Sequence, residues 1–281
     1  MEKNSIPDHL RSDCENCFGL CCVALPYAKS ADFALNKEGG TPCSNLQADF
    51  RCMIHNQLRE KGFRGCVAYE CFGAGQKVSR VTYGGNDWRE HPATAKEMFE
   101  VLPRMQQLHE MLYYLNEALG LEEARSIFAD LQAAVEETES LTIQSSESIL
   151  DLDIPAHRAK VNELLLRTSE LVRAKVNRKK NQKKHNKIGK GSDLIGAKLR
   201  GADLRAMNLR GALLIAADLR ESDMRAADLI GADFRDADLR GANLSGSIFL
   251  TQAQVNAARG DIHTKLPISL RMPAHWLNIG K

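Results

Sequence analysis

The chain has 281 residues, of which 43% are hydrophobic and 26% are charged, and its formal net charge is +2. This size and composition suit a protein of two or three domains. No apolar run approaches the length that spans a bilayer, and the N-terminal segment MEKNSIPDHLRSD lacks the apolar core of a signal peptide. We therefore expect a soluble, cytoplasmic protein and no membrane partner.

The cysteines are the first feature along the chain. All eight lie in one stretch of 58 residues: Cys14, Cys17, Cys21, Cys22, Cys43, Cys52, Cys66 and Cys71. A reducing cytosol works against structural disulfides, and closely spaced thiolates bind zinc or hold iron-sulfur clusters. The spacing therefore predicts that these eight residues are metal ligands, with disulfides or independent free thiols as the alternatives.

The segments around these cysteines, CENCFGLCC, CSNLQADFRCMIH and GCVAYEC, resemble the family of zinc- or iron-chelating CxxCxxCC domains. The resemblance covers about residues 10–76 and implies a zinc or iron-sulfur cofactor of unresolved identity. The first motif, from Cys14 to Cys22, is one residue longer than the family's name describes. The closing pair is Cys66 and Cys71, with Tyr69 between them.

Two details of the cysteine stretch qualify this prediction. Cys21 and Cys22 are adjacent, so both thiols do not easily point at one metal ion. His55 could replace a thiolate, although a surface or hydrogen-bonding role is the alternative. Four nearby basic residues could moderate the negative charge of a thiolate centre or be merely exposed: Arg51, Arg59, Lys61 and Arg64.

From about residue 92 to residue 176 apolar residues recur every three or four positions, which predicts helices. We expect these stripes to form an antiparallel helical hairpin and a companion helix. A homodimer formed through them is an open alternative. The segment NRKKNQKKHNKIGKGS follows, with seven Lys or Arg and no acid. It predicts either a solvated linker or weak nucleic-acid contact through Lys179, Lys180, Lys183 and Lys184.

A five-residue unit then repeats twelve times from Ser192 to Phe249. Each unit has five positions. The first is a small residue, the second is usually Asp or Asn, and the third is a large apolar residue. The fourth is usually Arg, and the fifth is Gly, Ala or an acid. A period of five fits neither a helix nor a strand, so the chain must turn a corner in each unit. Four units would close one coil, residues twenty apart would stack, and the small and large residues would face inward.

This repeat resembles the pentapeptide-repeat family, whose motif is A(D/N)LXX and whose fold is a right-handed quadrilateral β-helix. The resemblance implies about three coils, roughly 14 Å tall at the spacing of paired strands. Some family members confer antibiotic resistance or bind topoisomerases as acidic mimics of DNA. Residues 193–246 contain nine acids and eight bases, a net charge of −1, which argues against DNA mimicry here. After the repeats, Thr251 and Gln254 form a capping-box pattern that predicts a short helix covering the open end.

Together these features predict a multidomain α + β protein: a cysteine-rich metal-binding module (1–90), a helical region (91–176), a basic linker (177–191), a β-helix (192–250) and a C-terminal cap (251–281). No catalytic residues can be assembled from the motifs, so the sequence favours a bacterial binding or regulatory protein with an unidentified protein partner. The alternatives are an iron-sulfur redox sensor or enzyme, and a resistance or topoisomerase-binding protein.

Overall fold

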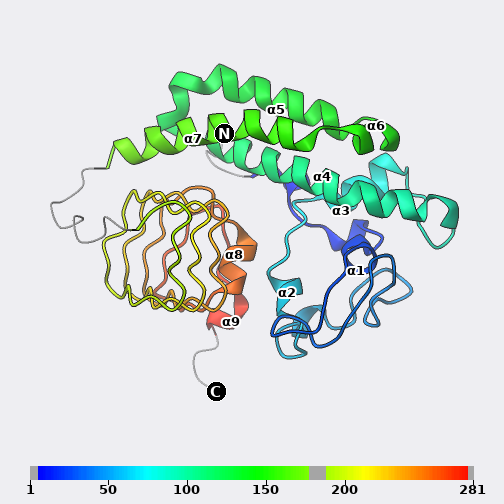
Figure 1. Ribbon diagram of the computed structural model, residues 1–281, viewed down its shortest axis with the longest axis horizontal. Coiled ribbons are helices and arrows are strands. Elements are labelled where there is room, and N and C mark those ends of the chain that lie inside the picture. Colours follow the sequence, from blue (N-terminus) through cyan, green and yellow to red (C-terminus); the bar gives the residue numbers. More distant parts are fainter. Residues whose placement is uncertain (1–5, 177–187, 278–281) are drawn as a thin grey trace. The chain divides into compact units, whose positions relative to one another are not determined.

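We describe the protein from a computed structural model, which covers residues 6–176 and 188–277 (Figure 1). Lys179, Lys180, Lys183 and Lys184 of the basic linker lie outside the described residues. The chain forms two compact units. The cysteine–helix unit consists of residues 6–119 and 127–165, and the repeat unit consists of residues 120–126 and the described part of 166–281.

The first part of the cysteine–helix unit is made of loops and very short helices (Figure 1). These are η1 (Asp8–Leu10), η2 (Cys14–Asn16), α1 (Leu20–Ala24), η3 (His55–Gln57), α2 (Arg64–Val67), α3 (Ala74–Lys77) and the π-helical η4 (Val78–Thr82). Two isolated antiparallel bridges, Tyr27 with Lys37 and Leu46 with Cys52, tie the loops together.

Longer helices follow: α4 (Pro92–Leu119), η5 (Glu122–Ile127), α5 (Phe128–Thr142), α6 (Ser146–Asp151) and α7 (Ile154–Ala174). Within the cysteine–helix unit, α4 and α5 pack against each other and α1, α3 and α6 pack on α4. Met98, Leu102 and Met105 are fully or almost fully buried, and they share a core with Phe18 and Leu20 of the cysteine-bearing part. The helical stripe thus fixes the position of the cysteine-bearing loops.

In the repeat unit, residues 192–249 form a coil that we call the repeat coil (Figure 1). Parallel bridges pair residues twenty apart: Asp193–Leu213, Lys198–Asp218, Asp203–Asp223, Asn208–Asp228, Leu213–Asp233, Asp218–Asp238, Asp223–Asn243 and Asp228–Ile248. The large apolar residues from Leu199 to Phe249 are all buried. Four five-residue units therefore make one turn of the coil, and the stacked turns share an apolar interior.

The expected right-handed β-helix, and with it the α + β fold class, is wrong. Within residues 6–176 and 188–277 there is no β-strand and no sheet, and the repeat coil is held only by single-residue bridges. The physical reason is the short length of chain between two successive corners of the coil. A two-residue turn in every unit leaves only one bridged residue between corners, so the pairing never extends to a second consecutive residue.

The corners of the coil explain the residue that ends each unit. That residue has a positive φ at every corner from Gly196 to Gly246, with φ between 52° and 69°. Glycine adopts this left-handed conformation at no steric cost, whereas other residues are strained in it. Six of the eleven corners from Gly196 to Gly246 are therefore glycine, and the other five are Ala, Glu or Asp.

Arginine and aspartate side chains pair along the outside of the coil. Arg220 lies 2.6 Å from Asp218 of its own unit and 3.7 Å from Asp238 of the next turn. The hydrogen bond from the Arg220 guanidinium lowers the pKa of Asp218 to about 2. Arg200 bonds Glu221 at 2.7 Å. Acidic side chains therefore lie close enough to the stacked arginines to offset the repulsion between them.

The C-terminal segment covers one end of the coil. Helix α8 (Gln252–Ala257) begins with the predicted capping box between Thr251 and Gln254. Arg259 and Lys265 form bridges with Asp238 and Asn243 of the last turn. Trp276, in α9 (Ala274–Leu277), is fully buried in the core of the coil, and its indole donates to the Ala258 carbonyl at 3.1 Å. Within the repeat unit, this segment therefore pairs with the last turn of the coil and places Trp276 in its core.

We expect Ser222→Ala to stabilise the repeat unit by about 1 kcal/mol. Ser222 occupies the small position of its unit, is 1% exposed, and its hydroxyl has no hydrogen-bond partner among the described residues. Alanine fills that position in most other units. Ser192→Ala is the matched control, because the Ser192 hydroxyl accepts a 2.8 Å hydrogen bond from the Gly189 N–H. Urea unfolding measures both; a loss of stability at Ser222 as large as that at Ser192 would contradict the burial argument.

Candidate metal centre

All eight predicted ligands belong to the cysteine–helix unit. None forms a disulfide; Cys14 is exposed and the other seven are partly buried. Among the described residues, no three His, Cys, Asp or Glu side chains converge closely enough to hold a metal ion. The thiols nevertheless fall into two looser groups, which meet at the adjacent pair Cys21 and Cys22.

The first thiol group consists of Cys14, Cys17, Cys21 and Cys71. Gly75 of α3 lies beside two of them, since a Cβ atom added there would be 2.8 Å from the Cys17 Sγ and 3.8 Å from the Cys71 Sγ. Although Cys14 is exposed as a residue, partial desolvation of its thiol raises its pKa to about 11, and the thiols of Cys71, Cys17 and Cys22 add to the rise. The absence of a side chain at Gly75 therefore leaves the space that the two sulfur atoms occupy.

The second thiol group consists of Cys22, Cys43, Cys52 and Cys66. The Cys43 N–H donates to the Cys22 carbonyl at 2.9 Å, and Cys52 lies on the hairpin that starts at Cys43. Burial raises the pKa of Cys66 to about 12, and the thiols of Cys22, Cys43 and Cys52 add to the rise. These four residues come from three parts of the chain, which are α1, the hairpin that carries Cys43 and Cys52, and α2, so only the folded loops bring them together.

Cys21 and Cys22 link the two groups. Both lie in α1, and their sulfur atoms are 4.0 Å apart. The hydrogen bond between the two thiols and burial raise the pKa of Cys21, and the thiols of Cys17 and Cys71 add to this effect. The same hydrogen bond lowers the pKa of Cys22, and the ammonium group of Lys37 acts in the same direction. The surroundings of the two thiols overlap, because Cys22 also acts on the pKa of Cys14 and both thiols act on that of Lys37.

Backbone amides act on three of the sulfur atoms. The Asn45 N–H donates to the Cys43 Sγ at 3.5 Å. Burial raises the pKa of Cys17, and the N–H groups of Leu20 and Gly19 oppose that rise. Burial also raises the pKa of Cys52, opposed by the Ile54 N–H. Hydrogen-bond donors of this kind favour the thiolate, which is the form that binds metal ions.

Lys37 is a charged neighbour that the sequence did not reveal. Its side chain is buried, and Nζ donates to the carbonyls of Val23, Glu38 and Thr41 at 3.0, 3.1 and 2.9 Å. Burial lowers the pKa of Lys37, and the thiols of Cys43 and Cys22 oppose the change. No motif surrounds Lys37 in the sequence, and only the folded loop places it beside the second thiol group.

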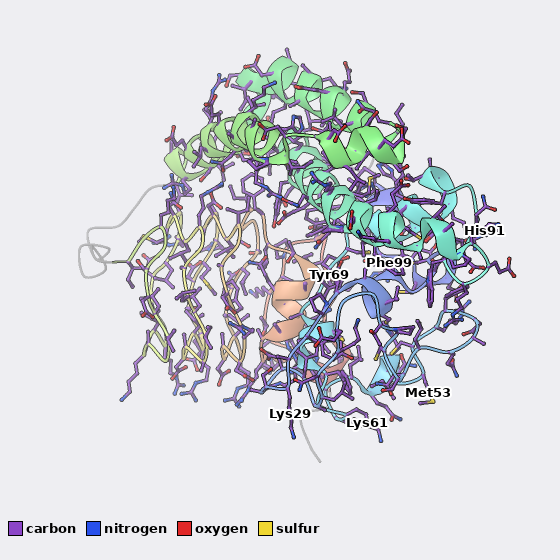
Figure 2. All side chains as sticks on the ribbon, turned by 45° about the vertical axis from the view of Figure 1, so that its right-hand side comes forward. Lys29, Met53, Lys61, Tyr69, His91 and Phe99 are labelled. Atoms are coloured by element: carbon purple, nitrogen blue, oxygen red, sulfur yellow. The ribbon has the colours of Figure 1, made fainter. Side chains whose placement is uncertain are left out.

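Two tyrosines also face the thiols. The Tyr27 hydroxyl donates to the Cys43 Sγ at 3.2 Å. The Tyr69 hydroxyl is buried and has no hydrogen-bond partner among the described residues. Burial raises the pKa of Tyr69, and the thiols of Cys21 and Cys71 add to the rise. In Figure 2, Tyr69 lies among other side chains, whereas Lys29, Met53 and Lys61 project outward from the loops.

Three of the other predicted neighbours of the metal, Arg51, His55 and Lys61, are exposed. Arg51 pairs with Glu15 at 2.8 Å and with Asp49 at 3.8 Å. His55 is exposed at the start of η3, and Lys61 is exposed in the following loop. A positive charge that does act on a thiol is that of Lys37, which lowers the pKa of Cys22.

The repeat coil defines the class of the protein. The family model described as Pentapeptide repeats matches in eight copies over residues 190–225 and 208–246. The chain belongs to the pentapeptide-repeat proteins. It is similar to "Uncharacterized protein YybG" of Bacillus subtilis (strain 168), with 65% identity over 267 residues, which are 95% of each chain. No solved structure matches the chain.

That similarity extends well beyond the repeats, since the matched region of the coil is a small part of the 267 aligned residues. In the described parts of the chain, every helix is too short or too polar to cross a membrane.

Proposed function

We propose that this pentapeptide-repeat protein is a metal-binding protein, in which the cysteine module (residues 10–76) holds metal through thiolates. The observation that carries the proposal is the set of donors beside the sulfur atoms: the Asn45 N–H and the Tyr27 hydroxyl on Cys43, and the buried Tyr69 hydroxyl that lacks an acceptor. Buried polar groups are normally hydrogen-bonded, and a metal-bound thiolate accepts such bonds.

The donor set fits zinc or an iron-sulfur cluster, because both are held by cysteine thiolates. Zinc would supply a cross-link between loops, and a cluster would supply an electron-transfer group. The thiols release their protons on binding, and in small modules the free energy of metal binding becomes free energy of folding. The module has few long secondary-structure elements of its own, so this contribution would be large there.

The repeat coil is proposed to contact a protein partner. Its arginines are largely neutralised by aspartates of the same unit, at 2.6 to 2.8 Å for Arg220, Arg225 and Arg235. A nearly neutral surface of this kind gives little electrostatic gain on nucleic-acid phosphates. The metal module would then control or stabilise the protein that presents the coil.

We expect the double substitution Cys14→Ser/Cys17→Ser to lower the metal content of the purified protein by about one ion per chain. Metal analysis measures the change. Met53→Ser is the control, because Met53 lies in the same module and is 63% exposed. Full metal content and an unchanged absorption spectrum in the double variant would show that these two residues are not ligands.

A further inference from the structure

We propose that the protein forms a symmetric dimer in which the first turns of two repeat coils stack end to end. The first turn consists of residues 192–211, and it lies at the opposite end of the coil from α8 and α9 (Figure 1). The interface would pair Asp193 of one copy with Lys198 of the other. This inference goes beyond the proposed function and does not depend on metal binding by the cysteines.

The backbone of the first turn has hydrogen-bonding groups ready for another chain. In later turns, the bridged residue of each unit bonds to the preceding turn through both its N–H and its carbonyl. The Asp218 N–H donates to the Ala197 carbonyl at 2.9 Å, and the Asp218 carbonyl accepts the Leu199 N–H at 2.8 Å. Asp193 and Lys198 hold the same position in the first turn, and their N–H and carbonyl groups make no hydrogen bond to the residues that the structure describes.

The other end of the coil is already satisfied. The Arg259 N–H donates to the Ala237 carbonyl at 2.8 Å, and the Arg259 carbonyl accepts the Leu239 N–H at 2.7 Å. Lys265 continues the next side of the coil in the same way. An open edge is a template for pairing with another chain, and this coil has its open edge at the first turn. Assembly through that edge therefore stops at two copies.

A two-fold axis can satisfy the open edge. Asp193 and Lys198 lie on adjacent sides of the first turn, on either side of the Gly196 corner. An axis through that corner, perpendicular to the axis of the coil, exchanges the two sides and reverses the direction of winding, so the facing sides run antiparallel. Each residue offers a donor and an acceptor on one edge, which is what a hydrogen-bonded antiparallel pair requires. Two identical Asp193–Lys198 pairs would result.

The side-chain charges favour this axis. Asp193 and Lys198 are exposed, have opposite charges, and form no ion pair with the residues that the structure describes. The aspartates at the same position of later units all pair with an arginine: Asp203, Asp218, Asp223, Asp228, Asp233 and Asp238. An axis through the middle of either side would place Asp193 or Lys198 opposite itself, where like charges repel. The next corner would pair Lys198 with Asp203, which Arg205 already neutralises at 2.7 Å.

The apolar interior is also incomplete at the first turn. Leu194 and Ala197 are only partly buried, whereas Leu214 and Ala217, one turn later, are completely buried. Ile195, at the corner between them, is 54% exposed. A second first turn stacked on this end would remove apolar surface from water, which favours association.

The test is the dissociation constant of the dimer of full-length protein, measured by analytical ultracentrifugation under reducing conditions. We expect wild type to dimerise. Lys198→Asp should raise the dissociation constant by at least about tenfold, because it puts an acid opposite Asp193 in both pairs. Aspartate suits the fold there, since Asp218 and Asp238 occupy the same column and Arg200 stands two residues on, as in the paired units.

An exchange of charges separates this interface from damage to the coil. Asp193→Lys/Lys198→Asp restores opposite charges across the two-fold axis, so its dissociation constant should return close to that of wild type. Lys265→Asp is the matched control, because it makes the same charge change at an exposed residue of the covered end and should leave dimerisation unchanged.

Three results would overturn the proposal. Wild type that stays monomeric at the highest concentration measured would exclude the dimer. A dimer that Lys198→Asp leaves intact would place the interface elsewhere, as in a seam between helices. Failure of the exchanged pair to restore dimerisation would contradict the pairing of Asp193 with Lys198.

Discussion

Leu219→Asp should lower the free energy of unfolding of the repeat unit by more than about 4 kcal/mol. Leu219 is completely buried in the interior of the coil. Aspartate at this position would place a carboxylate among apolar side chains, and it would also remove the packing of the leucine. Leu219→Met is the control and should cost less than about 1.5 kcal/mol, because it conserves volume. Met224 already occupies the corresponding position of the next unit.

The two tryptophans provide the measurement for this prediction. Trp276 is buried in the core of the repeat unit, and Trp88 lies in the cysteine–helix unit, where its indole donates to the Phe18 carbonyl at 2.9 Å. Urea unfolding in a Trp88→Phe background therefore reports the repeat unit through Trp276. Equal destabilisation by Leu219→Asp and Leu219→Met would contradict the inward orientation of this position.

Arg210→Met should destabilise the repeat unit by about 3–5 kcal/mol, whereas Arg220→Met should cost at most about 1 kcal/mol. Both arginines follow the large apolar residue of their units. Arg210 Nη1 lies 3.1 Å from an Asp228 carboxylate oxygen, and the Asp228 side chain is fully buried. Arg220 pairs with Asp218 at the surface, where both side chains are about one-third exposed. Removing Arg210 leaves a buried charge that water does not solvate.

A rescue variant separates the lost charge pair from lost packing. Adding Asp228→Asn to Arg210→Met removes the buried charge, so stability should partly recover. Asn208 stands twenty residues before Asp228 and pairs with it, so an amide side chain already occupies the stacked position in the neighbouring turn. Equal losses of unfolding free energy for Arg210→Met and Arg220→Met in urea would show that the buried pair contributes no more to stability than the surface pair.

The sequence predicted those parts of the fold that follow from local periodicity. The five-residue repeat predicted the buried large residues and the pairing of residues twenty apart, and Thr251 with Gln254 predicted the start of α8. It did not predict that the coil lacks strands, because that depends on how many residues remain for pairing between the turns at each corner. The family resemblance implied a β-helix, and the described residues show only isolated bridges.

The candidate site was only partly predictable. Clustering and spacing selected the eight cysteines, but the sequence alone did not divide them between two groups. Which thiols lie near one another depends on how the loops pack. The sequence did not single out Lys37, because its burial results from three carbonyl contacts. The sequence indicated Arg51 as a nearby positive charge, but Arg51 pairs with Glu15.

The most direct test of metal binding is the metal and sulfide content of anaerobically purified full-length protein, measured together with its visible absorption and thiol reactivity. We expect the protein to contain bound metal. It should be either colourless with stoichiometric zinc or brown with matching amounts of iron and sulfide. Most of the eight thiols should resist a thiol reagent until the protein is denatured. Metal-free protein whose eight cysteines all react in the native state would contradict the account.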